Sequence, residues 1–536
     1  MRNNNLNTKK LFYENELLPL YLERCRWFRS KARKIQSVKI TEDIPIGKNS
    51  AVAHLLFLEV LYVEGLSETY LLPVSFASKS ASEKIIKENP AAVISKLKCG
   101  DADGIIYEGT FDQSFRKNIL LMIAKKSSAD GSHGKLTAYP GKFLKTFLQP
   151  DKFPSLEKSQ ILKVEQSNTS FLYGDKLIFK LFRKLEEGVN PELEIGKFLT
   201  EKTSFRNTPL FAGAIEYGRS GFRPIVIGIV QSFVANYGDA WKYSLDSLER
   251  YYERVLARKT EIQKIPSPPI SILEAAYIIP PPQIREMAGV DYLEMVRLLG
   301  KRTAELHLSL NNETQDPYFT AEPFSALEQH SLYQSQRSLT KKVFETLRKN
   351  QKTLPASVGA ETSKLLNSEK EIIAKFKLLH NKKISAVKLR IHGDYHLGQV
   401  LFTGNDFVII DFEGEPMKSL CERRLKSSPL KDVAGMLRSF HYAAYTALNK
   451  NITVKTENIS EVEQWAVLWY KYVSGSFLRA YLDTVKDIPF VPKDKEELKI
   501  MLDAFMLEKA IYELGYELNT RPEWLIIPIK GIKGLL

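Results

Sequence analysis

The segment from Ile391 to Pro416, IHGDYHLGQVLFTGNDFVIIDFEGEP, constrains the fold more than any other stretch of the chain. Its two apolar runs, QVLF and FVIID, flank the turn TGND (403–406), a pattern typical of two buried strands with a tight connection. The polar side chains stand before the first run and after the second. A hairpin places these two ends side by side, and carboxylates gathered there repel one another unless cations are present. The segment therefore predicts a hairpin with a charged site at its polar ends.

A zinc site is the first alternative for these polar residues. His392 and His396 are four residues apart, which on a helix would place both on one face. Gly393 and the strand-like residues that follow argue against a helix, and the sequence HExxH does not occur. A plain buried hairpin is the second alternative, but it leaves the polar ends unexplained.

Phosphotransfer chemistry does explain the polar ends. Asp394 would act as the catalytic base that accepts the proton of an attacking hydroxyl. Gln399, five residues later, and Asp411, after the second strand, would hold Mg²⁺ on the phosphates of a nucleotide. An H-x-D sequence, then an amide, then D-F is the order of the catalytic loop and the metal-binding aspartate in kinases. This combination predicts a kinase site.

The groups that such a site needs upstream are also present. Lys180 lies in the apolar strand-like run LIFKLF, from which a kinase lysine reaches the α- and β-phosphates. A lysine in such a run is more often an edge or surface residue. However, Glu194 lies on the helix predicted for 189–200, where Asn190 fits the N-cap and Pro191 the first helical position, and it can pair with Lys180.

Small polar residues are expected to bind the nucleotide phosphates. Gly141-Lys142 is followed by Phe143, so the chain has no Walker A loop at this position. The polar stretch EQSNTS (165–170) offers backbone N–H groups and hydroxyls in place of glycines. The expected nucleotide contacts are Gln166, Ser167, Asn168, Thr169, Ser170 and Lys180, together with Gln231 and Phe233 in the connector that follows.

Length and charge narrow the class of protein. A chain of 536 residues, 44% of them hydrophobic, favours two or three folded domains. The net charge of +14 is scattered without runs of five basic residues, so an anionic nucleotide substrate explains it at least as well as nucleic acid, which we do not expect as a partner. The three cysteines lie far apart, and we find no signal peptide and no apolar stretch of about 18 residues. We therefore expect a cytoplasmic protein without a membrane segment.

The pattern after Asp239 is mainly helical. Its main interruption, Lys264 to Gln283, contains six prolines, which fix φ and remove backbone donors. We expect an extended surface excursion or lid there.

Long stretches of the chain resemble the bacterial maltokinases, distant relatives of the aminoglycoside phosphotransferases with an added N-terminal cap. The matching stretches run in order through most of the chain: 24–33, 165–200, 231–243, 300–310, 322–337, 391–416, 428–444 and 508–532. Gln399 stands where the wider superfamily has Asn, and the maltokinases also have Gln. Since Gln offers the same carbonyl ligand, metal binding stays feasible.

The resemblance implies an α+β, bilobal protein kinase-like fold. It divides the chain into an N-terminal α+β cap (1–110), a β-rich N-lobe (111–231) and a large, mainly helical C-lobe (232–536). It also implies ATP- and Mg²⁺-dependent phosphorylation of maltose at the anomeric hydroxyl, which gives maltose 1-phosphate for α-glucan (glycogen) synthesis. Association with trehalose synthase, of the same pathway, is a further expectation.

The sugar is expected in the helical lobe, where carboxylates, amides and aromatic faces should meet it. The segment YELGYELNTRPEW (512–524) offers these groups, although an amphipathic terminal helix with core aromatics is the alternative. The candidate sugar contacts are His396, Glu413, Tyr512, Glu513, Tyr516, Glu517, Asn519, Arg521 and Trp524. Asp432 resembles the family's supporting aspartate and would orient the catalytic loop, whereas His441 and Trp27 are more typical of structural residues.

Two other functions stay open at this point. The chain could be a kinase of the same fold that acts on another sugar or an amino-alcohol. It could also be a catalytically silent kinase-like module that partners trehalose synthase. The presence of Lys180, Glu194, Asp394 and Asp411 argues against the silent module.

Overall fold

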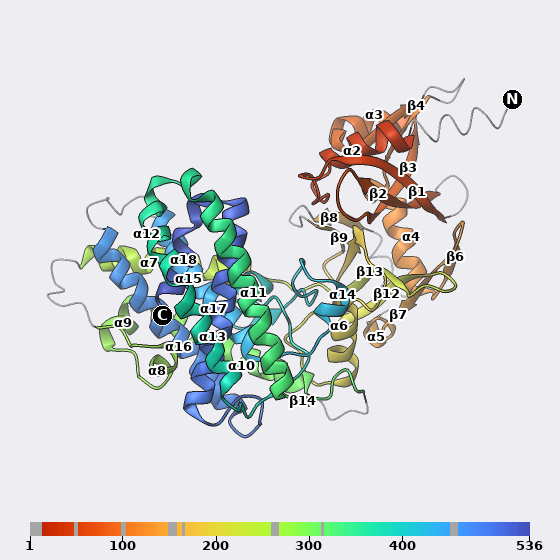
Figure 1. Ribbon diagram of the computed structural model, residues 1–536. Helices are drawn as coiled ribbons and strands as arrows, with labels where there is room; N and C mark the ends of the chain where they lie inside the picture. The colour runs from red at the N-terminus through yellow and green to blue at the C-terminus, as the bar shows by residue number, and fades with distance from the viewer. Residues whose placement is uncertain are drawn as a thin grey trace. The chain divides into compact units, whose positions relative to one another are not determined.

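The computed structural model describes residues 13–47, 52–97, 103–147, 158–162, 167–258, 267–311, 316–450 and 459–536. The chain forms two compact units. The first unit comprises residues 1–202 and 209–234, and the second comprises residues 203–208 and 235–536 (Figure 1).

Two antiparallel sheets build the first unit. The smaller sheet has the order β1 (Ile35–Ile46), β2 (Ala53–Tyr62), β3 (Glu68–Ser78), β5 (Gly104–Glu108), β4 (Val93–Leu97), and β11 (Lys184–Leu185) also pairs with β3. The larger sheet has the order β6 (Ser128–Asp130), β7 (Lys135–Pro140), β12 (Phe211–Gly218), β13 (Ile225–Ser232), β10 (Leu177–Phe182), β9 (Asn168–Tyr173), β8 (Ser159–Leu162). The helical segments are η1 (Tyr13–Leu17), α2 (Leu18–Arg24), α3 (Lys79–Glu88), η2 (Pro90–Ala92), η3 (Gly109–Phe111), α4 (Gln113–Ala124), α5 (Lys142–Phe147) and α6 (Pro191–Lys202).

One hydrophobic core joins the two sheets. Leu55 and Phe57 of β2 belong to the same buried cluster as Phe115 of α4 and Phe171 of β9. In β2, buried positions alternate with more exposed ones along most of the strand, as one-sided packing of a sheet requires. The segment predicted as a cap therefore shares its core with the β-rich segment that follows it.

A buried ion pair also connects the two sheets. Arg183, directly after β10, is 1% exposed and pairs with Glu108 at the end of β5. Its Nε also donates to the Thr169 hydroxyl at 2.8 Å, and its guanidinium lies 4.5 Å from the ring centre of Trp27. Breaking such a buried pair costs about 3–5 kcal/mol, because the remaining charge is left without its partner. Trp27 is 8% exposed, which agrees with its interpretation as a structural residue.

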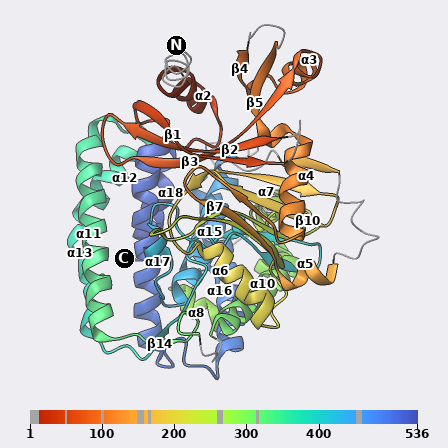
Figure 2. The same ribbon diagram turned by 90° about the vertical axis from the view of Figure 1, so that its right-hand side faces the viewer.

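The second unit is mainly helical, as predicted. In Figure 2, α11 and α13 run alongside α17, and all three pack against one another. Its helical segments are α7 (Ala240–Ala257), α8 (Ile272–Ala276), α9 (Pro282–Ala288), α10 (Val290–Leu310), α11 (Ala326–Asn350), η5 (Gln351–Thr353), α12 (Ala356–Asn367), α13 (Glu369–Asn381), η6 (Leu397–Gln399), α14 (Leu420–Arg423), α15 (Leu430–Lys450), α16 (Ile459–Val485), α17 (Lys495–Thr520), η8 (Pro522–Trp524) and α18 (Ile526–Lys533). Two short antiparallel strand pairs complete it: β14 (Glu322–Pro323) with β15 (Val387–Lys388), which α11, α12 and α13 separate in the chain, and the hairpin of β16 (Val400–Phe402) with β17 (Phe407–Ile409).

The proline-rich interruption differs from the prediction. Its described part, from residue 267, is not an extended excursion but contains α8 and begins α9, and Ile272 and Ile284 are buried. Pro282 occupies the first position of α9, where a proline is compatible with a helix. The backbone of α8 reaches Gly475 of α16 so closely that a Cβ there would lie 2.7 Å from Ala275. Apolar packing therefore outweighs the prolines in this segment.

The structure confirms the predicted fold class, α+β with a large helical region. None of the helices in the described ranges combines the length and the apolar composition that crossing a membrane requires.

Candidate active site

The hairpin β16–β17 forms where the sequence predicted it. Val400 and Ile409 are fully buried and face each other in register, and the turn closes when the Thr403 N–H donates to the Asp406 carbonyl at 2.9 Å. Arg302 of α10 donates twice to the Asp406 carboxylate, at 2.9 and 2.7 Å. The hairpin is thus fixed to the helical unit at its turn, which leaves its open end for the polar residues.

A buried carboxylate holds the loop before the hairpin. Asp432 of α15 accepts hydrogen bonds from the backbone N–H groups of His392 (2.7 Å) and Gly393 (2.9 Å). His307 Nε2 lies 3.2 Å from the same carboxylate. Burial would raise the pKa of Asp432, but the hydrogen bond and charge of His307, with the loop contacts, lower it overall. Asp432 therefore stays ionised and orients the loop.

Two backbone features shape this loop. Gly393 adopts φ +86°, a conformation that residues other than glycine rarely adopt. His392 Nε2 lies 2.9 Å from the Ile410 carbonyl, so the ring connects the loop to the end of β17. Together these contacts place Asp394 beside the hairpin.

Asp394 has a lysine as its neighbour. Lys509 Nζ of α17 lies 3.3 Å from Asp394 Oδ1, and the two side chains are 23% and 21% exposed. Burial would lower the pKa of Lys509, but the charges of Asp394, Glu415 and Glu513 raise it overall, so the ammonium stays protonated. Asp394 and Tyr512 line a cavity of about 220 Å³. A small hydroxyl compound in this cavity would meet the carboxylate directly.

Gln399 and Asp411 lie together, as the metal prediction requires. Gln399 Nε2 donates to Asp411 Oδ2 at 2.8 Å. Asp411 has φ +67°, and among the described residues it shares positive φ outside glycine only with Lys126. Such a conformation costs about 1–3 kcal/mol and persists where surrounding structure enforces it. The two side chains supply an amide and a carboxylate, the oxygen donors that Mg²⁺ prefers.

Lys180 lies in the first unit, on β10. Its Nζ donates to Glu192 Oε2 at 2.7 Å, and the two side chains are 11% and 3% exposed. We predicted Glu194 as this partner, whereas the structure gives the ion pair to Glu192, two residues earlier in α6. Residues two apart on a helix point to different sides, so the pairing depends on where the helix begins. Asn190 determines that position, since its Oδ1 accepts from the N–H groups of Glu192 and Leu193.

Three of the six residues predicted as a phosphate loop (165–170) belong to a strand. Gln166 lies outside the described residues, Ser167 precedes β9, and Asn168, Thr169 and Ser170 belong to β9. The Thr169 hydroxyl accepts from Arg183. Ser170 stands directly opposite Lys180 in register, and opposite residues of an antiparallel pair share one face of the sheet.

The connector residues lie at the end of β13. Gln231 pairs in register with Ile178 of β10, and the Phe233 N–H donates to the Lys176 carbonyl at 2.7 Å. The first unit ends one residue later, at Val234.

The side chains of the predicted sugar segment, 512–524, do not all face one site. Of its members, Tyr512 lines the cavity at Asp394. Glu513 pairs with Arg438 at 2.7 Å, and buried Glu517 pairs with Arg521 at 2.7 Å. These two carboxylates satisfy cations of the protein, which the four-residue spacing alone did not reveal.

The remaining sugar candidates lie farther along the same segment or in the loop. Tyr516 is 51% exposed, the Asn519 amide donates to the Gly515 carbonyl, and the Arg521 guanidinium lies 5.0 Å from the ring centre of Trp524. His396 lies in the loop itself, where its Nδ1 accepts from the Gly398 N–H at 3.1 Å. Glu413 follows Asp411 by two residues and is partly exposed.

Sequence reasoning missed a charged cluster at the cavity. Lys431 Nζ lies 3.3 Å from Glu508 and 3.6 Å from Glu415, and Lys418 lies 2.8 Å from Glu415. Glu508 and Lys509 precede Tyr512 by four and three positions, so they occupy the same helix face as the tyrosine. That spacing was the available signal for Lys509.

Known proteins are similar to this chain in both sequence and fold. A family model described as the maltokinase N-terminal cap domain matches residues 21–112. A glucosamine kinase of Mycolicibacterium smegmatis is 24% identical over 378 residues, which cover 70% of this chain and 79% of that protein. A glucosamine kinase of Streptacidiphilus jiangxiensis is 24% identical over 148 residues, 27% of this chain and 31% of that protein.

The similarity in fold extends over nearly the whole chain. The solved structure of a glucosamine kinase in complex with glucosamine, ADP and inorganic phosphate aligns with a TM-score of 0.60 at 15% identity, covering 97% of each chain. The prediction of a kinase-like fold with an N-terminal cap is therefore confirmed. In these comparisons the match to a maltokinase model covers the cap, residues 21–112.

The loop histidine provides a pH test of this geometry. Burial holds the pKa of His396 below the usual 6.5, although the charge of Asp394 opposes this shift. We predict that NMR titration of the folded protein gives His396 a pKa below 6.5, and that Asp394→Asn lowers it further by removing the opposing charge. With a folded-state pKa below 6.5, the imidazole binds a proton more readily in the unfolded chain than in the folded protein. His396 therefore lowers the free energy of unfolding as the pH falls through about 6.5. A pKa at or above 6.5, or an increase in Asp394→Asn, would contradict the geometry; His396→Gln assigns the signal.

Proposed function

We propose that the protein phosphorylates maltose at its anomeric hydroxyl with ATP, in the cytoplasm, giving maltose 1-phosphate for α-glucan (glycogen) synthesis. The observation that carries the choice of maltose is the match of residues 21–112 to the maltokinase N-terminal cap domain. The kinase-like fold and the arrangement of Asp394, Gln399 and Asp411 support the phosphotransfer. Association with trehalose synthase belongs to the same proposal.

In this reaction Asp394 is the catalytic base. The sugar hydroxyl binds in the cavity beside Asp394, and its proton moves to the carboxylate as the oxygen attacks the γ-phosphorus of ATP. The bond from that phosphorus to the bridging oxygen breaks, and ADP leaves with the electron pair. Lys509 Nζ lies 3.3 Å from the Asp394 carboxylate, so we assign Lys509 the positioning of Asp394.

In this proposal Lys180, held by Glu192, binds the α- and β-phosphates of ATP. The ion pair limits the freedom of the lysine before ATP arrives, which reduces the entropy lost on binding. Ser170, opposite Lys180 on the sheet, and the backbone of residues 167–169 are the proposed neighbours of the phosphates.

Mg²⁺ is the metal that fits the residues present. Gln399 and Asp411 would hold it, since an amide oxygen and a carboxylate form a hard donor set. A bound Mg²⁺ would neutralise negative charge on the phosphates of ATP.

Glucosamine is the competing substrate, because the curated relatives and the aligned structure are glucosamine kinases. Its ammonium group would require an acidic partner at the cavity. Glu415 and Glu508 are the acidic groups that line this cavity besides Asp394 and Asp432, and both already face Lys431. This arrangement favours a neutral sugar. Another sugar, an amino-alcohol and a catalytically silent partner of trehalose synthase are the remaining alternatives.

A substrate panel tests the choice of maltose. We predict that kcat/KM with Mg-ATP is at least about 100-fold higher for maltose than for glucosamine, glucose or ethanolamine. The measurement is ADP release coupled to an indicator enzyme, at saturating Mg-ATP. Preferential turnover of glucosamine would contradict maltose as the substrate and make the protein a glucosamine kinase. Tight ATP binding without turnover of any compound would favour the catalytically silent module. Asp394→Asn is the control: it should lower kcat about 10²- to 10⁴-fold while ATP still binds.

The partner of Lys180 gives a second test. We predict that Glu192→Gln lowers kcat/KM for ATP about 10- to 100-fold, since the buried lysine loses a charged hydrogen bond. Glu194→Gln, the matched change two residues away, should stay within about twofold. The reverse ranking would restore Glu194 as the functional partner, and circular dichroism of both variants controls for folding.

A further inference from the structure

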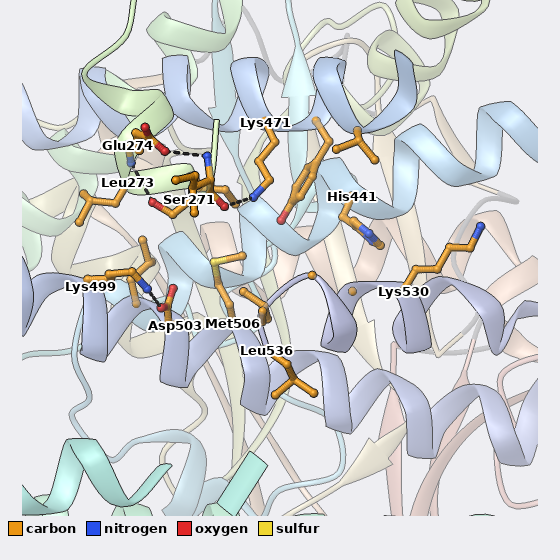
Figure 3. Close-up of a pocket in the computed structure, with 18 of the residues that line it drawn as sticks. Ser271, Leu273, Glu274, His441, Lys471, Lys499, Asp503, Met506, Lys530 and Leu536 are labelled. Carbon is orange, nitrogen blue, oxygen red and sulfur yellow. Dashed lines mark hydrogen bonds and ion pairs between the residues drawn. The ribbon is translucent and has the colours of Figure 1, made fainter. Parts of the chain in front are cut away.

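A second cavity, of about 510 Å³, lies within the helical unit. Figure 3 shows its walls, which come from α8, α13, α15, α16, α17 and α18. No described residue lines both this cavity and the one at Asp394. Asp503 and Met506 of α17 face the second cavity, whereas Lys509 and Tyr512 face the first, so the helix separates the two. The proposed phosphotransfer makes no use of this space.

Basic side chains outnumber acidic ones along its walls. The charged lining residues are Lys375, Lys471, Lys499, Lys530, Glu274 and Asp503. Lys499 pairs with Asp503, and Lys530 pairs with Glu463 at 2.5 Å. Of the two acidic lining residues, Asp503 is thus engaged with a lysine, whereas Glu274 accepts from the Ile270 N–H at 2.6 Å.

Lys471, like Lys375, contacts a backbone carbonyl and forms no ion pair among the described residues. Its Nζ donates to the Ile270 carbonyl at 2.9 Å, and within the described ranges no carboxylate forms an ion pair with it. Burial lowers the pKa of Lys471, and the more distant charges of Asp503 and Glu274 offset this only in part. A partly buried ammonium of this kind gains from an anion at hydrogen-bond distance.

The remaining walls are mostly apolar and aromatic. Leu273, Val467, Met506 and the rings of Tyr445 and Tyr470 line the cavity.

His441 lies beside these two tyrosine rings, with ring centres at 4.7 and 4.9 Å. It is 4% exposed, and its Nδ1 lacks a hydrogen-bond partner within the described part of the chain. Burial holds the pKa of His441 well below 6.5, so the imidazole is neutral at pH 7 and adds no charge to the wall. A ligand here would meet both apolar surface and ammonium groups.

We propose that this cavity is a binding site for a small amphipathic anion, in which one acidic group meets Lys471 and an apolar or aromatic body fills the space among Leu273, Val467 and Met506. The volume lies within the range of small-molecule sites. The acidic group is a carboxylate, sulfonate or phosphate, since all three accept hydrogen bonds from an ammonium.

The test uses the full chain and a matched pair of fluorescent probes. 1-Anilinonaphthalene-8-sulfonate carries the acidic group, and N-phenyl-1-naphthylamine is its uncharged counterpart. We expect saturable binding of the sulfonate at one site, unchanged by excess Mg-ATP. Lys471→Met keeps most of the side-chain stem and should weaken the sulfonate about tenfold or more while leaving the uncharged probe within about twofold.

Two further variants locate the site. Val467→Phe fills the cavity without changing its charge and should weaken both probes, whereas Lys301→Met, a change of an exposed lysine on α10, should weaken neither. Circular dichroism and the melting temperature establish that each variant is folded.

Four results would overturn the proposal. They are the absence of saturable sulfonate binding, displacement by Mg-ATP, equal weakening of both probes by Lys471→Met, and unchanged binding in Val467→Phe. The last result would place the anion at Lys471 on the surface and not in the cavity.

Discussion

The catalytic loop depends on one buried carboxylate. Asp432 accepts from two successive backbone N–H groups, of His392 and Gly393, and faces His307 from a second helix. Buried backbone donors need partners, and a charged acceptor with several donors is a strong one. Because α10 and α15 both contribute to this contact, the loop inherits its position from the packing of the helical unit. The location of Asp394 follows from that position.

The polar groups at the hairpin ends form a balanced set. Lys509 faces Asp394, and Gln399 donates to Asp411, which has a positive φ. Carboxylates gathered without cations would repel one another, and the structure meets this constraint near Asp394 with a lysine from α17. At the other end, a cation beside the Asp411 carboxylate and the Gln399 amide would meet the same need for positive charge, and this supports Mg²⁺ as the proposed metal. The acidic residues of the segment 391–416 are thus compensated in part by a cation from outside that segment, Lys509.

Much of this arrangement was predictable, and the exceptions share a cause. The hairpin 400–409 and the strand position of Lys180 follow from local apolar patterns, which a sequence displays directly. The partner of Lys180 was displaced by two residues, since it depends on how a short strand and a capped helix meet. Lys509 lies 115 residues from Asp394 and could be found only through its spacing to Tyr512. Glu513 and Glu517 looked like sugar ligands, but cations of the protein already engage them. Local patterns therefore predict elements, while side-chain partners depend on tertiary packing.

The central claim is transfer of phosphate to an anomeric oxygen, and the ³¹P NMR spectrum of the product tests it most directly. The anomeric carbon carries one hydrogen, so a phosphate on its oxygen gives a doublet in the proton-coupled spectrum. A primary hydroxyl lies on a carbon with two hydrogens and gives a triplet or a doublet of doublets. After incubation with maltose and Mg-ATP, the account predicts a new doublet whose coupling disappears when the anomeric proton alone is decoupled. A signal coupled to two protons, or the absence of a sugar phosphate signal, would contradict it.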